Sequence, residues 1–112
     1  MKKQLMLAAL MMTVAAVAQA ADAPSLERGK ELFESTKLGF DNNKAGPTGK
    51  SCASCHPGGK KLEWAATYDD AKLVGIINTC VSKALKGKPL DPAGNDMQSL
   101  VIYIKTFAGP GR

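Results

Sequence analysis

The apolar positions of this chain recur at helical spacing in three stretches, whereas the alternating pattern of a strand is weak throughout. Helices are predicted over residues 25–34, from residue 69 or 70 onward, and over residues 95–107. The positions on their apolar faces are, in chain order, Leu26, Gly29, Leu32 and Phe33; Leu73, Val74, Ile76, Ile77 and Val81; and Met97, Leu100, Val101, Ile104 and Phe107. The pattern therefore predicts an all-α fold.

The ends and interior of these helices carry further signals. Ser25 is the expected N-cap of the first helix, and Asp69 or Asp70 should begin the second. Gly29 lies inside the first helix, where glycine costs up to about 1 kcal/mol relative to alanine, so we expect it to allow close contact with another helix. Loops are predicted over residues 38–50 and 87–92, where Gly, Asn and Pro are dense.

The first twenty residues have the form of an export signal rather than of a folded segment. Lys2 and Lys3 precede an apolar run over residues 5–18, which is too short to span a bilayer. The small-x-small pattern Ala18-Gln19-Ala20 is typical of a signal peptidase site. We therefore expect a signal peptide over residues 1–20, one domain over residues 21–112 and a periplasmic location. A retained membrane anchor is the alternative, against which the length and flanks of the run argue.

The run Cys52-Ala53-Ser54-Cys55-His56 has the form C-x-x-C-H, which is the attachment signal for a covalently bound c-type haem. Two thiols at this spacing can each form a thioether with one vinyl group of the porphyrin, and His56 then follows as the proximal iron ligand. A zinc site would need a second pair of ligands, and a thioredoxin-like pair would need a βαβ setting. The sequence therefore predicts one haem c, attached after export.

Size and charge agree with a small haem domain. Removing 20 of the 112 residues leaves 92. A domain of this length is only marginally stable without a further stabilising group, and a covalent haem would provide one. Loss of Lys2 and Lys3 lowers the formal charge from +5 to +3. Two haem propionates would lower it to about +1, so no strong basic field remains for binding nucleic acid.

The second axial position of the iron is open to several candidates. His56 is the only histidine, so bis-histidine ligation within one chain is excluded. The candidates are Cys80, Met97, an asparagine (Asn78 or Asn95), a lysine or no ligand at all. Cys80 is the one thiol that the motif does not use, although it could also be a buried small hydrophobe or form an intermolecular disulfide. Met97 lies in the first turn of the last predicted helix, where a methionine more often fills the core.

The order of the elements resembles the class I cytochromes c. The G-x-x-L-F pattern of residues 29–33 lies in the first helix, C-x-x-C-H follows, and the closing helix holds Leu100 and Tyr103. The resemblance spans nearly the whole mature chain and implies a small fold in which the first and last helices cross over one haem. The usual distal methionine of that family would fall near Gly87, so Met97 is poorly placed for the role.

A second resemblance is to haem domains of the c-type cytochrome subunit of the Sox thiosulfate-oxidising system. Two stretches carry it, GKSCASCH at residues 49–56 and INTC at residues 77–80, followed by KPL at 88–90 and LVIYI at 100–104. In that family the cysteine of I-N-x-C is the distal haem ligand, and thiosulfate dehydrogenases similarly use His/Cys haems. The resemblance covers about one haem domain and implies Cys80 as the distal ligand, with Met97 as the alternative.

The function expected from these features is transfer of single electrons between redox proteins of the periplasm. An iron with both faces filled cannot bind substrate, so we expect a carrier rather than an enzyme. One alternative is a haem subunit that takes part in the oxidation of thiosulfate or related sulfur compounds, alone or in a larger complex. Another is a gas-binding haem module whose sixth position is open.

Overall fold

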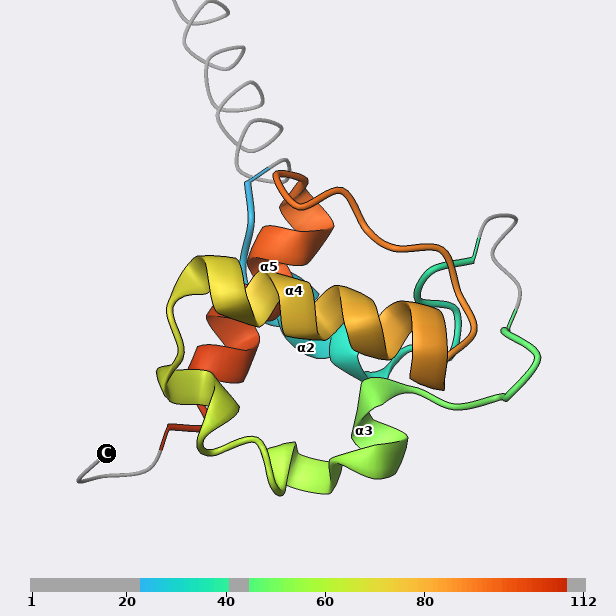
Figure 1. Cartoon of the computed structure of the whole chain (residues 1–112), viewed down its shortest axis with the longest axis horizontal. Helices are drawn as coiled ribbons and strands as arrows, with labels where there is room; N and C mark the ends of the chain where they lie inside the picture. The colour runs from blue at the N-terminus through green and yellow to red at the C-terminus, as the bar shows by residue number, and fades with distance from the viewer. Residues whose placement is uncertain (1–22, 41–44, 109–112) are drawn as a thin grey trace, which may run out of the picture.

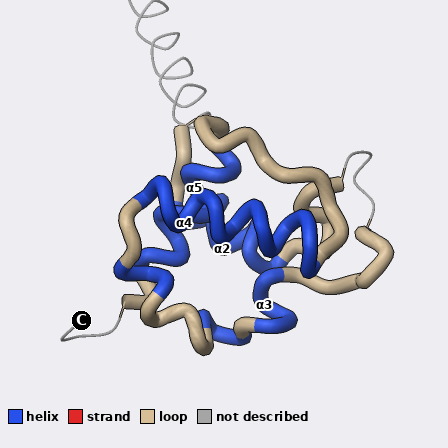
Figure 2. Tube along the Cα trace, viewed as in Figure 1, coloured by secondary structure: helices blue, strands red, loops and turns tan. Residues whose placement is uncertain are grey.

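The computed structural model describes residues 23–40 and 45–108, and every regular element in that part of the chain is helical (Figures 1 and 2). The α-helices are α2 (Leu26–Glu34), α3 (Cys52–Cys55), α4 (Asp70–Thr79) and α5 (Asn95–Lys105). Two 3-10 turns span Pro57–Gly59 and Ala65–Thr67, and a π-helical turn spans Cys80–Ala84. The all-α prediction is confirmed for the described residues, whereas the predicted signal peptide lies outside them.

Helix α2 packs closely on α5, as the glycine in its apolar face predicted. A Cβ atom built on Gly29 would overlap the carbonyl oxygen of Ser99 and lie 2.7 Å from Cβ of Tyr103. The predicted N-cap is also confirmed, because the Ser25 side chain accepts a hydrogen bond of 3.1 Å from the backbone N–H of Arg28. The Ser25 N–H in turn donates to the buried Ser99 hydroxyl at 3.0 Å, which fixes the start of α2 against α5.

Helix α4 begins where the sequence predicted, but its end differs from a regular helix. The Asp69 side chain caps it by accepting a 2.8 Å hydrogen bond from the Lys72 N–H, and Leu73 and Ile77 are buried. The helix then widens into the π-helical turn, in which the Leu85 N–H donates to the Cys80 carbonyl at 3.0 Å. The apolar pattern did not predict the π-helical turn, because the turn leaves the same face of the helix buried as far as Val81.

Helix α5 contributes more residues to the core than any other helix. It ends at Lys105, two residues before the predicted end, and 3-10-type hydrogen bonds close the last turn. The ring of Phe107 still packs beyond the helix end, with its centroid 5.5 Å from that of Phe33 and 5.0 Å from that of Tyr103. The buried core consists of Leu32, Phe33, Leu38, Leu73, Ile77, Val81, Leu85, Met97, Leu100, Val101 and Ile104.

The segment between α3 and α4 runs along the edge of this core, against which Leu62 and Ala65 pack. In Figure 1 it runs as a wide arc, green to yellow, from α3 below α4 to the start of α4. Glycines at positive φ, Gly58 at 62° and Gly59 at 79°, give the backbone the tight turn with which the arc begins. The arc and α4 thereby frame the site described below. Within residues 23–40 and 45–108, no helix has the length and hydropathy needed to cross a membrane, in agreement with the sequence.

Candidate functional site

One apolar cavity brings together four of the five residues that the sequence singled out. Cys52, Cys55 and His56 line it from α3 and the residue after it, and Cys80 lines it from the start of the π-helical turn. The space between its lining atoms is about 600 Å³ when the open mouth is included. Apart from these four side chains and Ser51, every residue that lines it is apolar. The cavity therefore combines three sulfur atoms and one imidazole with walls that cannot hydrogen-bond to water.

The two motif cysteines lie on a single helical turn that its own flanks hold in place. Ser51 and Ser54 cap each other: the Ser54 N–H donates to the Ser51 hydroxyl at 3.2 Å, and the Ser51 N–H donates to the Ser54 hydroxyl at 2.9 Å. The His56 N–H closes the turn by donating to the Cys52 carbonyl at 2.9 Å. Residues three apart on a helical turn share a face, so both thiols reach the same cavity.

The imidazole of His56 is held by the backbone of the arc. Its Nδ1 lies 2.9 Å from the carbonyl oxygen of Lys60, which can only accept a hydrogen bond. Nδ1 is therefore the donor in this bond, and in the neutral ring the lone pair is on Nε2. A histidine that donates from one ring nitrogen to a carbonyl in this way presents the other nitrogen as a metal ligand.

Burial and neighbouring thiols raise the pKa values of two of the three cavity cysteines. Burial raises the pKa of Cys52 to about 11, and the nearby Cys80 adds to the effect. Burial also raises the pKa of Cys80, with a contribution from Cys55. In the absence of a bound group the thiol form is therefore favoured in the cavity, and a cation placed there would favour the thiolate.

Met97 does not share this cavity with His56. It is fully buried in the first turn of α5 and belongs to the hydrophobic core. The hollow that it lines is a different one, shared with Leu90, Gly94 and Asn95. Asn78, another candidate from the sequence, has its side-chain amide bound to the backbone of Leu90. Of the candidate distal ligands considered by residue, the structure brings only Cys80 to the cavity of His56.

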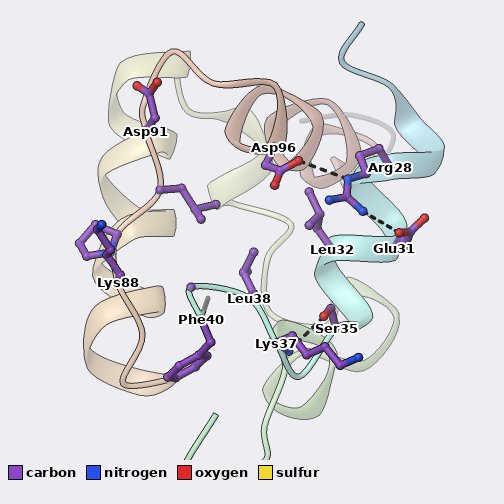
Figure 3. Close-up of a pocket in the computed structure, with 13 residues that line it drawn as sticks. Arg28, Glu31, Leu32, Ser35, Lys37, Leu38, Phe40, Lys88, Asp91 and Asp96 are labelled. Atoms are coloured by element: carbon purple, nitrogen blue, oxygen red, sulfur yellow. Dashed lines mark hydrogen bonds and ion pairs between the residues drawn. The ribbon is translucent and has the colours of Figure 1, made fainter. Parts of the chain in front are cut away.

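A second hollow, between α2 and the segments around residues 38 and 89, has a different character (Figure 3). Arg28 points between two carboxylates there, with a nitrogen 2.6 Å from Glu31 and another 3.2 Å from Asp96. Lys37, Lys88 and Asp91 also line it, so three cationic and three anionic side chains balance each other. No residue of the C-x-x-C-H motif reaches this hollow, and it offers no sulfur or imidazole ligand.

Several residues of the site lay beyond what the pattern of the sequence indicated. Leu62 and Ala65 line the cavity from the arc, where no helical period marks them as buried. Phe33 lines it from α2, and its place on the apolar face of the first predicted helix was the available signal. The paired serines around Cys52 could have been recognised as a capping motif from their spacing of three.

The arrangement offers two thiols at the spacing used for covalent attachment, apolar walls, and a nitrogen and a third sulfur of the kinds that bind metal ions. Soft thiolate and borderline imidazole ligands together suit iron, copper or zinc rather than magnesium or calcium. The ligand types alone do not select among these metals. No protein-family model, curated protein or solved structure was found that matches this chain.

Proposed function

We propose that this protein is an exported, periplasmic c-type cytochrome with one covalent haem that carries single electrons between redox partners. The observation that carries the proposal is the apolar cavity in which Cys52, Cys55 and His56 meet Cys80. Each property of the cavity suits a haem: two thiols at the attachment spacing, an imidazole with its Nε2 lone pair free and apolar walls for the porphyrin faces. The haem would supply an iron that accepts and releases one electron.

The residues of the chain would have separate roles toward this group. Cys52 and Cys55 would hold it through thioethers, and Nε2 of His56 would be the proximal ligand. The carbonyl of Lys60 fixes the plane of the His56 ring and raises the basicity of Nε2, because it accepts a hydrogen bond from the Nδ1–H group. Cys80 would be the distal ligand as a thiolate, whose negative charge would stabilise the ferric state and lower the potential.

The fold supports a class I cytochrome c-like arrangement. In such a fold the first and last helices pack across each other beside the haem, and here α2 and α5 pack at the close contact of Gly29 with Ser99. Phe33 from α2 and Leu100 and Ile104 from α5 extend that contact to the cavity wall. Tightly packed walls of this kind restrict movement around the bound group, which favours rapid electron transfer.

The proposal is tested by producing the chain in a host that attaches haem to exported proteins. The wild-type protein should keep its haem on a denaturing gel and after acid extraction, whereas Cys52→Ala combined with Cys55→Ala should lose it. Cys80→Ala is the matched control, since it removes a cavity thiol that forms no thioether. A wild-type chain whose mass equals that of the polypeptide alone would contradict the proposal.

A second candidate function is participation in the oxidation of thiosulfate or related sulfur compounds. The observation that favours it is Cys80, a half-buried thiol in the same cavity as His56, as the resemblance to Sox haem domains implies. The test is reduction of the ferric protein by thiosulfate with formation of tetrathionate, compared between the wild type and Cys80→Ala. Reversible reduction by an artificial donor without consumption of thiosulfate would favour the carrier instead.

A further inference from the structure

Asn78 lies two residues before Cys80 and links α4 to the loop that returns from the π-helical turn. Its Nδ2 donates a 2.9 Å hydrogen bond to the carbonyl of Leu90, and its Oδ1 accepts a 2.8 Å hydrogen bond from the N–H of the same residue. Both groups of the amide are therefore bound to the backbone of one residue, twelve positions further along the chain. The bonds are partly buried, so their loss would leave polar groups poorly solvated.

The geometry of the helix relates this link to the position of Cys80. Successive residues of an α-helix are about 100° apart, so residues 78 and 80 lie about 200° apart, on nearly opposite faces. The cavity side of this stretch is marked by Leu73, Ile76, Ile77, Cys80 and Ala84. Asn78 is on the other side, and holding it against Leu90 turns the face that carries Cys80 toward the cavity.

The backbone around Cys80 needs such support because it is not a regular helix. The π-helical turn starts at Cys80, and its end is held by a 2.8 Å hydrogen bond from the Gly87 N–H to the Val81 carbonyl. The Ser82 hydroxyl donates to the Asn78 carbonyl at 2.9 Å, so Asn78 also binds this turn through its backbone. The loop itself is attached to the segment after α2 by a 2.7 Å hydrogen bond from the Lys88 N–H to the Gly39 carbonyl.

We infer that Asn78 is a positioning residue that holds the Cys80 sulfur at the distal face of the haem site. The inference rests on the proposed function, because it assumes a haem in the cavity. The amide of Asn78 is itself bound to Leu90 and is therefore unavailable as a ligand. Asn78 acts through the helix and the loop, and Cys80 remains the residue that touches the bound group.

The test compares holoproteins of the wild type, Asn78→Ala and Asn78→Asp. The readouts are the thiolate charge-transfer band of the ferric protein and the association rate of carbon monoxide with the ferrous protein. In Asn78→Ala the band should weaken and the rate should rise about tenfold. Each lost hydrogen bond shifts the equilibrium between bound and released Cys80 several-fold toward the released form. Asn78→Asp keeps the acceptor for the Leu90 N–H, so both readouts should lie between those of the wild type and Asn78→Ala. This variant also tests the inference if the alanine variant does not fold.

Thr79→Ala is the matched control, because the Thr79 hydroxyl binds only the Gly75 carbonyl within α4. It should leave the band and the rate as in the wild type. Asn78 variants that equal the wild type in both readouts would overturn the inference while leaving the haem proposal intact. If Cys80→Ala leaves the wild-type spectrum unchanged, Cys80 is not the ligand and the role of Asn78 falls with it. Absence of covalent haem would instead refute the proposed function itself.

Discussion

Gly29 of α2 lies against the backbone carbonyl of Ser99 in α5, at a distance that admits no side chain on the glycine. A methyl group there would overlap that oxygen, and backbone cannot move aside as a flexible side chain can. We predict that Gly29→Ala destabilises the protein by about 2–3 kcal/mol despite the better helix propensity of alanine, because overpacking outweighs it. Denaturant unfolding measures the change. Gly75→Ala in α4 is the control, since a Cβ there meets nothing within 4 Å and should stabilise.

The placement of Met97 and Cys80 leads to opposite predictions for their variants. Met97→Leu should leave the visible and near-infrared spectrum of the ferric holoprotein unchanged and cost less than about 1.5 kcal/mol, because it is a nearly volume-conserving change in the core. Cys80→Ala should remove the thiolate charge-transfer band and open the site to carbon monoxide. Magnetic circular dichroism distinguishes the two ligands. A thioether signature that disappears in Met97→Leu would show that the core methionine is the ligand.

Lys86 has a left-handed backbone conformation, with φ of 64°, just after the π-helical turn. A residue with a Cβ is strained there and glycine is not, so Lys86→Gly should stabilise the protein by about 0.5–1 kcal/mol. Lys83→Gly, inside the π-helical turn, should destabilise it by about 1 kcal/mol. Thermal unfolding of the two variants measures their stability relative to the wild type. Equal effects of the two substitutions would argue against strain at residue 86.

The raised pKa of Cys52 predicts how the haem-free chain depends on pH. Its thiol has a pKa of about 11 in the fold against 9.0 as the ordinary value, chiefly because of burial. The unfolded chain therefore loses this proton first as the pH rises, and stability that is complete below pH 9 is lost between about pH 9 and 11. The difference corresponds to about 2–3 kcal/mol.

Denaturant unfolding of the haem-free chain at several pH values measures this loss. Cys52→Ala is the control, because lysines and tyrosines titrate in the same range and their effect is common to both proteins. The wild type should lose more stability than the variant between pH 9 and 11. Parallel curves would indicate that the thiol of Cys52 is solvated before haem is attached.

The local signals in the sequence sufficed for the three longer helices, because caps and apolar periods act over a few residues. Ser25 and Asp69 cap α2 and α4 as their positions predicted. The π-helical turn was not predictable in this way, since an extra residue in a turn need not change which residues are buried. The loop that follows the turn is bound to it by the Gly87 N–H and to the distant Gly39 by the Lys88 N–H, and such a contact between separate parts of the chain leaves no local signal.

The site shows the same division between local and distant determinants. The spacing of Cys52, Cys55 and His56 is local, so a single helical turn brings them together. Cys80 was singled out as the thiol left over by the motif and by a resemblance, but its position in the same cavity depends on how α4 packs against α5. The double hydrogen bond between Asn78 and Leu90 has no signal in the sequence, because the backbone of any residue could have been the partner.

The group that orients the His56 ring is a backbone carbonyl, and every amino acid carries one. The side chain at position 60, now an exposed lysine, can therefore change during evolution without disturbing the imidazole. If the protein is the electron carrier proposed above, a change of charge at this point of the surface would alter which redox proteins approach it. The arrangement would then separate selection on electrostatic recognition from selection on the chemistry of the bound group.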